Sequence, residues 1–370
     1  MAATRAAGTL TGTGFRPVPG DLASYDTDLE DAAVHLGIAA DRLAPLAASD
    51  LPHVRDPGRG TLFDYTDLTN AAYFSGSGTS VPELAWRFLL RFGQSAPSTW
   101  YRPQTWDVTV QPPQTSRRVA RELGPLCLAV PDSGADGVEL LDVLETPGGT
   151  DASAPGGTDA ATPSLAGAAT PGHAGAATPG HAGAVTPGLA DRGYQDSGYR
   201  VVVRLSGTED QARDPRVRSA YDRVLDALGS GAVAYQAVAE ALRADPERAW
   251  ELGMADCVVA SRLIAAQLRA AGLTARTRRG YILGLVGGDH TWCEVEEDGR
   301  WKVLDPVFAH LIGRTGADDS FREACRGGRF NRLLPCAVDD AAPLIIRADG
   351  EPVPLWALAG VSARPWKERM

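Results

Sequence analysis

The sequence predicts an α+β protein with two ordered parts joined by a long linker. Residues 256–306 have the pattern of one helix followed by strands, residues 21–144 mix helical and strand patterns, and a short repeat separates these two stretches. The 370-residue chain has room for two ordinary domains. It is therefore divided into a flexible N-terminus (1–20), an N-terminal α+β domain (21–144), a linker (145–193) and a second domain (194–370).

Composition argues against several classes of protein. The formal charge of −10 and the lack of a basic face argue against a nucleic-acid partner. The chain starts without an apolar run of the signal-peptide type, and no later run approaches the length of a membrane span, so a cytoplasmic protein is expected. The five cysteines are odd in number and form no C-x-x-C pair, which disfavours both a disulfide framework and a zinc site.

The N-terminal part carries signals for helices and for strands. Residues 26–36 suggest a first helix, and Ser80 with Glu83 forms a capping box ahead of a strongly apolar helix. The later runs TWDVTV, CLAV and VELLDVL have the pattern of strands, or of strands and one short helix. We expect an α+β domain in which no chemistry is recognisable.

The stretch 145–193 has almost no large side chain to bury. Proline recurs in it every eight residues, at positions 147, 155, 163, 171, 179 and 187. Ordering such a segment would cost conformational entropy with little apolar burial in return. A disordered Pro/Gly octad-repeat linker, or a long disordered insertion, is therefore predicted.

Regular structure is expected to resume after the repeats. The segment GYRVVVRLSG contains a valine run that is typical of a buried strand. Residues 215–250 then predict two helices, which are separated at Gly229 to Gly231.

A further helix is expected to begin just after Asp256, which is a good N-cap residue, and to end near Gly272. Cys257 is then the first residue of this helix. The unpaired N–H groups and the positive end of the helix dipole favour a thiolate there, and they can also receive an oxyanion. Taken alone, such a cysteine is more often a small buried apolar residue.

Two strands joined by a tight turn follow. The pieces DHTWCEV and RWKVLDP flank Asp298-Gly299, which supplies the positive φ that short hairpins need. With a two-residue loop, residue 297 faces residue 300, so the numbers of paired residues add up to 597. Asp305 is then opposite Trp292, one diagonal step from His290 and on the same face. A four-residue loop would pair His290 with Asp305 directly.

Cys257, His290 and Asp305 have the order of a nucleophile, a base and an orienting carboxylate. A carboxylate bound to one ring nitrogen fixes the tautomer of a histidine and leaves the other nitrogen free to take a proton from a thiol. Singly, His290 is explained as a satisfied histidine on a half-buried strand, and Asp305 as a strand-end cap before Pro306. Jointly, the three residues favour chemistry.

Short motifs surround these residues: a cysteine that opens a helix, then RAAGLTAR, a strand with GY, DHTWCEV, DGRW and VLDP. As a set, these motifs resemble the catalytic core of the transglutaminase-like superfamily. The resemblance implies a papain-like α+β core in which Cys257, His290 and Asp305 are the catalytic residues. It does not identify the substrate, because the same core serves cross-linking, hydrolysis, deamidation and amide formation.

The predicted function is cysteine-dependent acyl transfer that needs no metal and no organic cofactor. The partners would be an acyl donor, which is an amide or a thioester and can be held on a carrier protein, and an amine acceptor. Amide formation suits a cytoplasmic, bacterial-looking protein, because secreted cross-linking or cell-wall enzymes need an export signal. An amide or peptide hydrolase with the same triad and a non-catalytic interaction module stay open as alternatives.

Five more residues are candidates for substrate binding. Arg276 and Arg278 share a strand face and could hold an anionic group, although a solvated strand face also explains them. Tyr281 is expected to line the cleft. Trp250 and Trp292 complete the set.

Overall fold

The computed structural model describes residues 15–36, 39–41, 44–45, 51–73, 81–112, 124–145, 194–195, 198–284, 288–313, 319–353 and 360–366. Most of the predicted flexible N-terminus and nearly all of the octad-repeat linker lie outside the described residues. Within the described ranges, no helix combines the length and the apolar character needed to cross a membrane.

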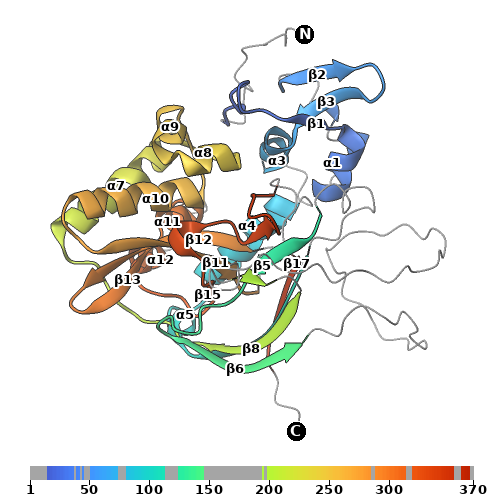
Figure 1. Ribbon diagram of the computed structural model, residues 1–370. Helices are drawn as coiled ribbons and strands as arrows, with labels where there is room; N and C mark the ends of the chain where they lie inside the picture. Colours follow the sequence, from blue (N-terminus) through green and yellow to red (C-terminus); the bar gives the residue numbers. More distant parts are fainter. Residues whose placement is uncertain are drawn as a thin grey trace.

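A five-stranded antiparallel sheet lies at the centre of the fold (Figure 1). Three of its strands follow one another in the sequence, and two short strands from later in the chain are added at the edges. In spatial order the strands are β14 (Arg326–Gly327), β13 (Arg300–Leu304), β12 (Asp289–Glu297), β11 (Ala275–Ile282) and β15 (Leu333–Pro335).

The hairpin formed by β12 and β13 has the predicted register. Glu297 faces Arg300, and the residue numbers of each pair in this ladder add up to 597. Asp298 and Gly299 have φ values of 56° and 71°. Positive φ at both loop residues gives a two-residue turn whose twist matches that of the flanking strands. The two-residue alternative is therefore confirmed.

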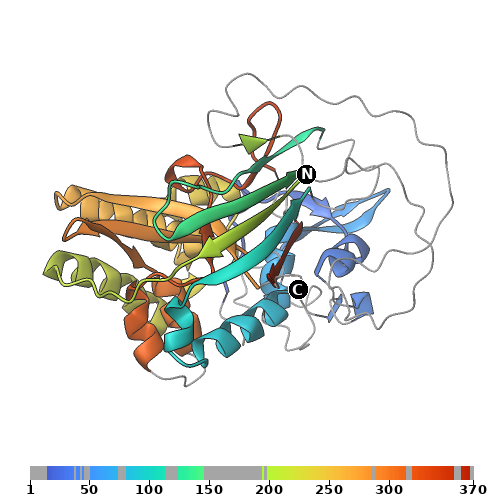
Figure 2. The ribbon, with the colours of Figure 1, turned by 90° about the horizontal axis from the view of Figure 1, so that it is seen from below.

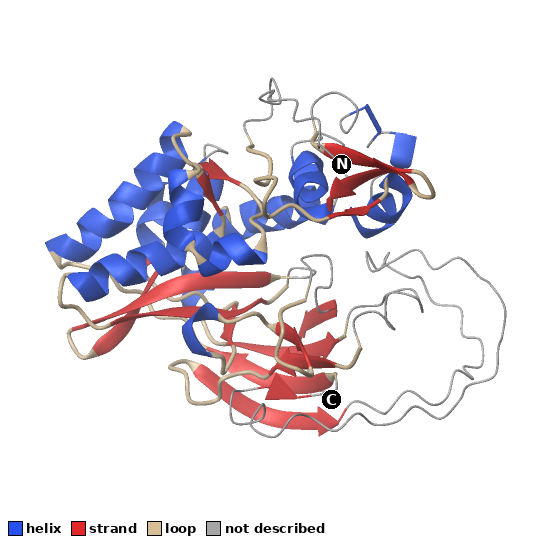
Figure 3. Cartoon of the chain, turned by 45° about the horizontal axis from the view of Figure 1, so that its top comes forward, coloured by secondary structure: helices blue, strands red, loops and turns tan. Residues whose placement is uncertain are grey.

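Helices cover one face of this sheet (Figure 3). The helix α10 (Cys257–Ala270) packs on β11 and β12 and also contacts α7 (Pro215–Ser230). The helix α11 (Pro306–Gly313) follows β13 and packs against α7 and α12 (Asp319–Ala324). A short 3-10 helix, η2 (Asp339–Ala341), contacts β11.

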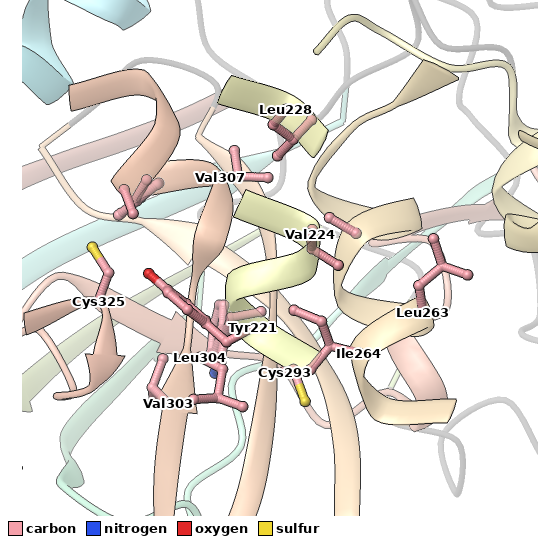
Figure 4. Close-up of a cluster of buried hydrophobic side chains, with 14 of the residues drawn as sticks. Tyr221, Val224, Leu228, Leu263, Ile264, Cys293, Val303, Leu304, Val307 and Cys325 are labelled. Atoms are coloured by element: carbon pink, nitrogen blue, oxygen red, sulfur yellow. The ribbon is translucent and has the colours of Figure 1, made fainter. Parts of the chain in front are cut away.

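Apolar side chains fill the space between these helices and the sheet. Figure 4 shows Tyr221 and Val224 of α7 gathered with Ile264 of α10 and with Val303 and Leu304 of β13. Burying one such side chain contributes about 1.5–3 kcal/mol. This packing holds the start of α10 at a fixed place over the sheet.

The predicted pair of helices over 215–250 is wrong in its second half. The first helix ends as expected, with Gly231 at φ 74° as its C-cap. A second long helix is interrupted at Pro246, where Asp245 caps a new helix by accepting a hydrogen bond from the Arg248 N–H. The segment and its continuation form β9 (Ala234–Tyr235), α8 (Glu240–Ala244), α9 (Pro246–Glu251) and β10 (Met254–Ala255), with β9 and β10 paired in parallel.

Two further sheets pack at the other side of the central sheet. Figure 2 shows four neighbouring strands in dark red, cyan, yellow-green and green. They are β17 (Gly360–Pro365), β4 (Gln104–Gln111), β8 (Tyr199–Leu205) and β6 (Val138–Glu145). A three-stranded sheet contains β16 (Ile345–Arg347), β5 (Leu126–Ala129) and β7 (Tyr194–Gln195). Tyr281 and Leu334 of the central sheet share one apolar cluster with Trp106 of β4 and Val203 of β8.

The four-stranded sheet joins segments that the sequence analysis placed in two domains. The strand β4 lies within 21–144, and β6 extends one residue beyond this stretch, to Glu145. The strands β8 and β17 come from 194–370. All four strands are hydrogen-bonded in one sheet. Alternating apolar residues indicate which face of a strand is buried, but not which strand lies beside it. The boundary at the repeats therefore separates two stretches of sequence that share a sheet and a core.

The first part of the chain forms an N-terminal layer, defined here by the described residues within 15–73. Its apolar cluster includes Phe15, Phe63 and Leu68. Its elements are β1 (Tyr25–Thr27), α1 (Leu29–Leu36), β2 (His53–Asp56), β3 (Gly60–Asp64) and α3 (Tyr65–Tyr73), and α4 (Val81–Gly93) and α5 (Ser98–Tyr101) lead on to β4. The Asn70 side chain joins the layer to the rest of the molecule, because it binds both the carbonyl oxygen (3.0 Å) and the N–H (2.6 Å) of Ala237.

Gly280 gives a test of the packing between β11 and β15. A Cβ at this position would lie 2.1 Å from the Leu334 carbonyl oxygen and 2.8 Å from Pro335 Cα. Because backbone would have to move, Gly280→Ala is expected to lower the free energy of unfolding by about 2–4 kcal/mol in chemical denaturation. Gly229→Ala in α7 is the matched control, since a Cβ there meets nothing within 4 Å. The control should be neutral or stabilising by up to about 1 kcal/mol, and equal effects of the two changes would contradict the tight contact.

Candidate active site

Cys257 is the first residue of α10, as predicted, and it differs from the other cysteines in exposure. It is partly exposed, whereas Cys127, Cys293, Cys325 and Cys336 are buried, and all five are free thiols. Burial raises the pKa of the Cys293, Cys325 and Cys336 thiols. Because the thiolate is the reactive form, Cys257 is the cysteine whose surroundings allow reaction.

The N–H groups at the start of α10 are largely occupied by its cap. Asp256 Oδ1 accepts hydrogen bonds from the N–H groups of Val258 (2.9 Å) and Val259 (3.0 Å), and the Ala260 N–H donates to the Asp256 carbonyl oxygen (3.0 Å). These three N–H groups already have acceptors, so they are not free to receive an oxyanion, a role that the sequence analysis expected of the helix start. The backbone N–H of Cys257 donates to no acceptor among the described residues, so it is the donor left for that role.

His290 and Asp305 form a short hydrogen bond in the interior. His290 Nε2 lies 2.6 Å from Asp305 Oδ2, and the two residues are 4% and 1% exposed. The second carboxylate oxygen accepts a hydrogen bond from the Phe308 N–H at 3.0 Å, which caps α11. The Phe308 ring stacks on the imidazole with 4.2 Å between centroids. Asp305 is therefore both a helix cap and a partner of His290, and Nδ1 of the ring is left for another group.

The surroundings of His290 favour its protonated form. Burial opposes the charge, but the Asp305 carboxylate and the hydrogen bond with Cys257 outweigh it and raise the pKa of His290 to about 10. This hydrogen bond brings Cys257 to the histidine, so the structure brings all three predicted residues together. A protonated imidazole next to a sulfur stabilises the thiolate as an ion pair.

The stretch that holds this triad matches a known family. Residues 201–306 match the model of the transglutaminase-like superfamily. The stretch is a transglutaminase-like domain. The match runs from β8 through α10 to the residue after Asp305, and it confirms the resemblance that the motifs indicated.

A solved structure is similar to a larger part of the chain than the transglutaminase-like domain. It is described as a "Putative Cysteine Protease" from Cytophaga hutchinsonii, with 12% sequence identity, a TM-score of 0.23, and coverage of 71% of this chain and 96% of that chain. A search of curated proteins gives no match.

Two tyrosines that sequence reasoning missed lie near the sulfur. The charge of Cys257 acts on Tyr235 of β9 and on Tyr73 at the end of α3; burial raises the pKa of both phenols, that of Tyr73 to about 12. Tyr235 is placed by the pairing of β9 with β10, which leads directly into Cys257. Tyr73 is placed by Asn70, one turn earlier in α3, which binds Ala237. Tyr73 lies outside the transglutaminase-like domain, and no local motif links it to the site.

The two candidate arginines already have protein partners. Arg276 Nε donates to Glu294 Oε2 at 2.8 Å, and its guanidinium lies 3.9 Å from the centre of the Trp301 ring. Arg278 forms an ion pair with Asp132. A guanidinium that is neutralised by a carboxylate has little attraction left for an anionic substrate. The alternative explanation, a solvated strand face, suits Arg276, whose side chain is 39% exposed, but not Arg278, which is buried.

The three aromatic candidates belong mainly to the cores. Tyr281 and Trp292 are each 1% exposed, and the Trp292 Nε1–H donates to Glu294 Oε1 at 3.1 Å. Because their side chains are buried, they are core residues rather than residues of a cleft. Trp250 of α9 is half-buried and packs against the apolar cluster that contains the start of α10. In the described part of the chain, no group of three or more His, Cys, Asp or Glu residues is arranged to hold a metal ion.

Proposed function

We propose that this protein is a cysteine-dependent acyltransferase that forms amide bonds through a thioester acyl-enzyme. The observation that carries the proposal is the arrangement of Cys257, His290 and Asp305 in the transglutaminase-like domain. Cys257 is the one cysteine of the five that is partly exposed, and the buried histidine beside it is held by a carboxylate. This is the set of groups that acyl transfer through a thioester requires.

The first half of the reaction forms the acyl-enzyme. The Cys257 thiolate attacks the carbonyl carbon of an amide or thioester, and the Cys257 N–H donates to the oxyanion that develops. The C–N or C–S bond then breaks as the protonated His290 gives its Nδ1 proton to the leaving amine or thiol. The acyl group is left on the sulfur as a thioester, and His290 is neutral.

The second half transfers the acyl group to an amine. The amine attacks the thioester carbonyl carbon and loses a proton to His290 Nδ1, and the C–S bond breaks to release the amide. The thiolate and the protonated imidazole are thereby restored. Asp305 keeps the ring in one orientation through both halves of the reaction.

The surroundings of the sulfur support transfer to an amine over transfer to water. Tyr73 and Tyr235 are partly buried and lie close enough to Cys257 for its charge to act on both phenols. Aromatic rings near a thioester reduce the access of water and prolong its life. An amine that binds beside these rings can then compete with water. We further propose a cytoplasmic location, because a reducing compartment keeps Cys257 a free thiol.

A partition experiment tests this function. The full chain is incubated with acyl thioesters, including carrier-bound ones, or with glutamine peptides, together with a primary amine, and the products are measured by mass spectrometry. The proposal expects more amide than free acid, and an acyl adduct on Cys257. If free acid is the sole product at high amine concentration, the protein is an amide or thioester hydrolase. If no adduct forms with a folded protein, the interaction-module alternative is favoured.

A further inference from the structure

A chain of ion pairs, built on the two buried arginines Arg243 and Arg279, connects the residue before Cys257 to the residue before His290. Asp256 Oδ2 lies 2.6 Å from Arg243 Nε, and Arg243 Nη1 lies 2.9 Å from Glu240 Oε2. Glu240 Oε1 is 3.7 Å from Arg279 Nη1, and Arg279 donates two hydrogen bonds to Asp289, at 2.9 Å and 2.7 Å. These five residues are called the buried ion-pair chain below.

Stability alone does not explain this arrangement. The side chains of Arg243 and Arg279 are 9% and 3% exposed, so both charges have been removed from water. The cost of that removal often equals or exceeds the attraction within a buried pair. A buried chain of this kind is better explained by the geometry that it imposes, and its two ends adjoin Cys257 and His290.

Both ends of the chain are carboxylates, and two of its members carry charges that favour the proposed reactive state. The Arg243 guanidinium interacts with Cys257, and the Asp289 carboxylate interacts with His290. One cation, Arg243, thus acts on the sulfur, and one anion, Asp289, acts on the imidazole. Glu240 lies between the two arginines and draws both toward one point.

We propose that the buried ion-pair chain positions Cys257 against His290 and stabilises their thiolate–imidazolium pair. The inference rests on the proposed function, in which Cys257 is the nucleophile. Arg243, Glu240 and Arg279 are positioning residues, because they act through Asp256 and Asp289 and through their charges. Of the five residues, Asp256 is the N-cap that the sequence predicted and Asp289 is the first residue of the motif DHTWCEV, whereas Arg243, Glu240 and Arg279 lie outside the motifs noted in the sequence.

Other groups also face the reactive pair. Tyr73 and Tyr235 face Cys257 from α3 and β9, and Asp305 faces His290 from the start of α11. These groups stay unchanged in the variants below. A change in pH dependence can therefore be assigned to the buried ion-pair chain.

Two variants that each remove one charge test the proposal. The rate of alkylation of Cys257 by iodoacetamide is measured against pH in the full chain, and the pH at half-maximal rate is compared. Arg243→Gln removes a cation that favours the thiolate, so this pH should rise by about one unit. Glu240→Gln removes an anion and should lower it by about one unit or less. Arg243→Lys should restore part of the first shift.

The control is Glu139→Gln, which breaks an exposed ion pair with Arg204 (2.7 Å) on the four-stranded sheet. It should leave the pH at half-maximal rate unchanged. Opposite shifts in the two test variants support the proposal, since a purely structural defect would not change sign with the charge removed. If Arg243→Gln fails to fold, the downward shift in Glu240→Gln decides, because glutamine has nearly the same size and shape as glutamate.

Shifts in one common direction, or none, overturn the inference alone. If Cys257 of the unaltered protein is alkylated no faster than the buried cysteines at any pH, the proposed function fails and the inference fails with it. The two failures are therefore distinguishable in one data set.

Discussion

Replacing Cys257 by serine is expected to lower the rate of amide formation by at least about 10⁴-fold. A serine hydroxyl holds its proton far more tightly than a thiol, so the His290 imidazolium no longer has an anion to stabilise. The stability of the protein should change little, because Cys257 is partly exposed and the two side chains are similar in size. Product formation in the amine assay measures the effect.

The matched control for this change is Cys127→Ala. Cys127 is buried in the apolar cluster between the sheets and has no place in the proposed reaction. This variant is expected to keep activity within a few-fold of the unaltered protein, at a cost of about 1 kcal/mol in stability. Comparable activity in Cys257→Ser and Cys127→Ala would rule out Cys257 as the nucleophile.

Asp305→Asn is expected to lower the rate by about 10³-fold, because an amide neither fixes the histidine tautomer nor stabilises the imidazolium as a carboxylate does. The pKa of His290, now about 10, should fall toward its ordinary value. The proposed reactive state needs a protonated His290. As pH rises, the variant should therefore lose activity at a lower pH than the unaltered protein does. The measurement is the pH–rate profile, whose alkaline limb should shift to lower pH in the variant.

The helix-capping role of Asp305 can be separated from its role toward His290. Asparagine caps helices about as well as aspartate. In Asp305→Asn the side-chain oxygen can therefore still accept the hydrogen bond that the Phe308 N–H donates to Asp305 Oδ1. The control is Asp245→Asn, which alters the cap of α9 away from any histidine partner. It should leave both rate and pH profile unchanged. An equal loss of activity in the two variants would contradict the orienting role of Asp305.

The triad could be predicted because its parts are local. An Asp-Gly turn fixes a hairpin of even loop length, and the even length puts His290 and Asp305 on one face whichever loop is chosen. An N-cap residue likewise places Cys257 at a helix start. The sequence analysis explained Asp305, taken singly, as a strand-end cap, whereas in the structure it caps the helix α11 and binds His290 as well.

The remaining features of the site depend on partners far away in the sequence. Arg278 has the pattern of a residue on a free strand face, and its partner Asp132 comes from before the repeats. Tyr73 reaches the sulfur from the N-terminal layer through the contact between Asn70 and Ala237. Alternation and capping carry no information on such pairings, because they report only local geometry. For the same reason, the sequence did not predict that β4, β6, β8 and β17 share one sheet.

The most direct test of the account is competitive alkylation of the five cysteines. The folded protein is treated with limiting iodoacetamide, and modified peptides are quantified by mass spectrometry in the unaltered chain and in His290→Ala. We predict that Cys257 reacts at least about tenfold faster than Cys325 or Cys336, and that His290→Ala slows Cys257 but not the others. If Cys257 reacts no faster than the buried cysteines, or keeps its full rate without the imidazole, the three side chains do not form a reactive unit.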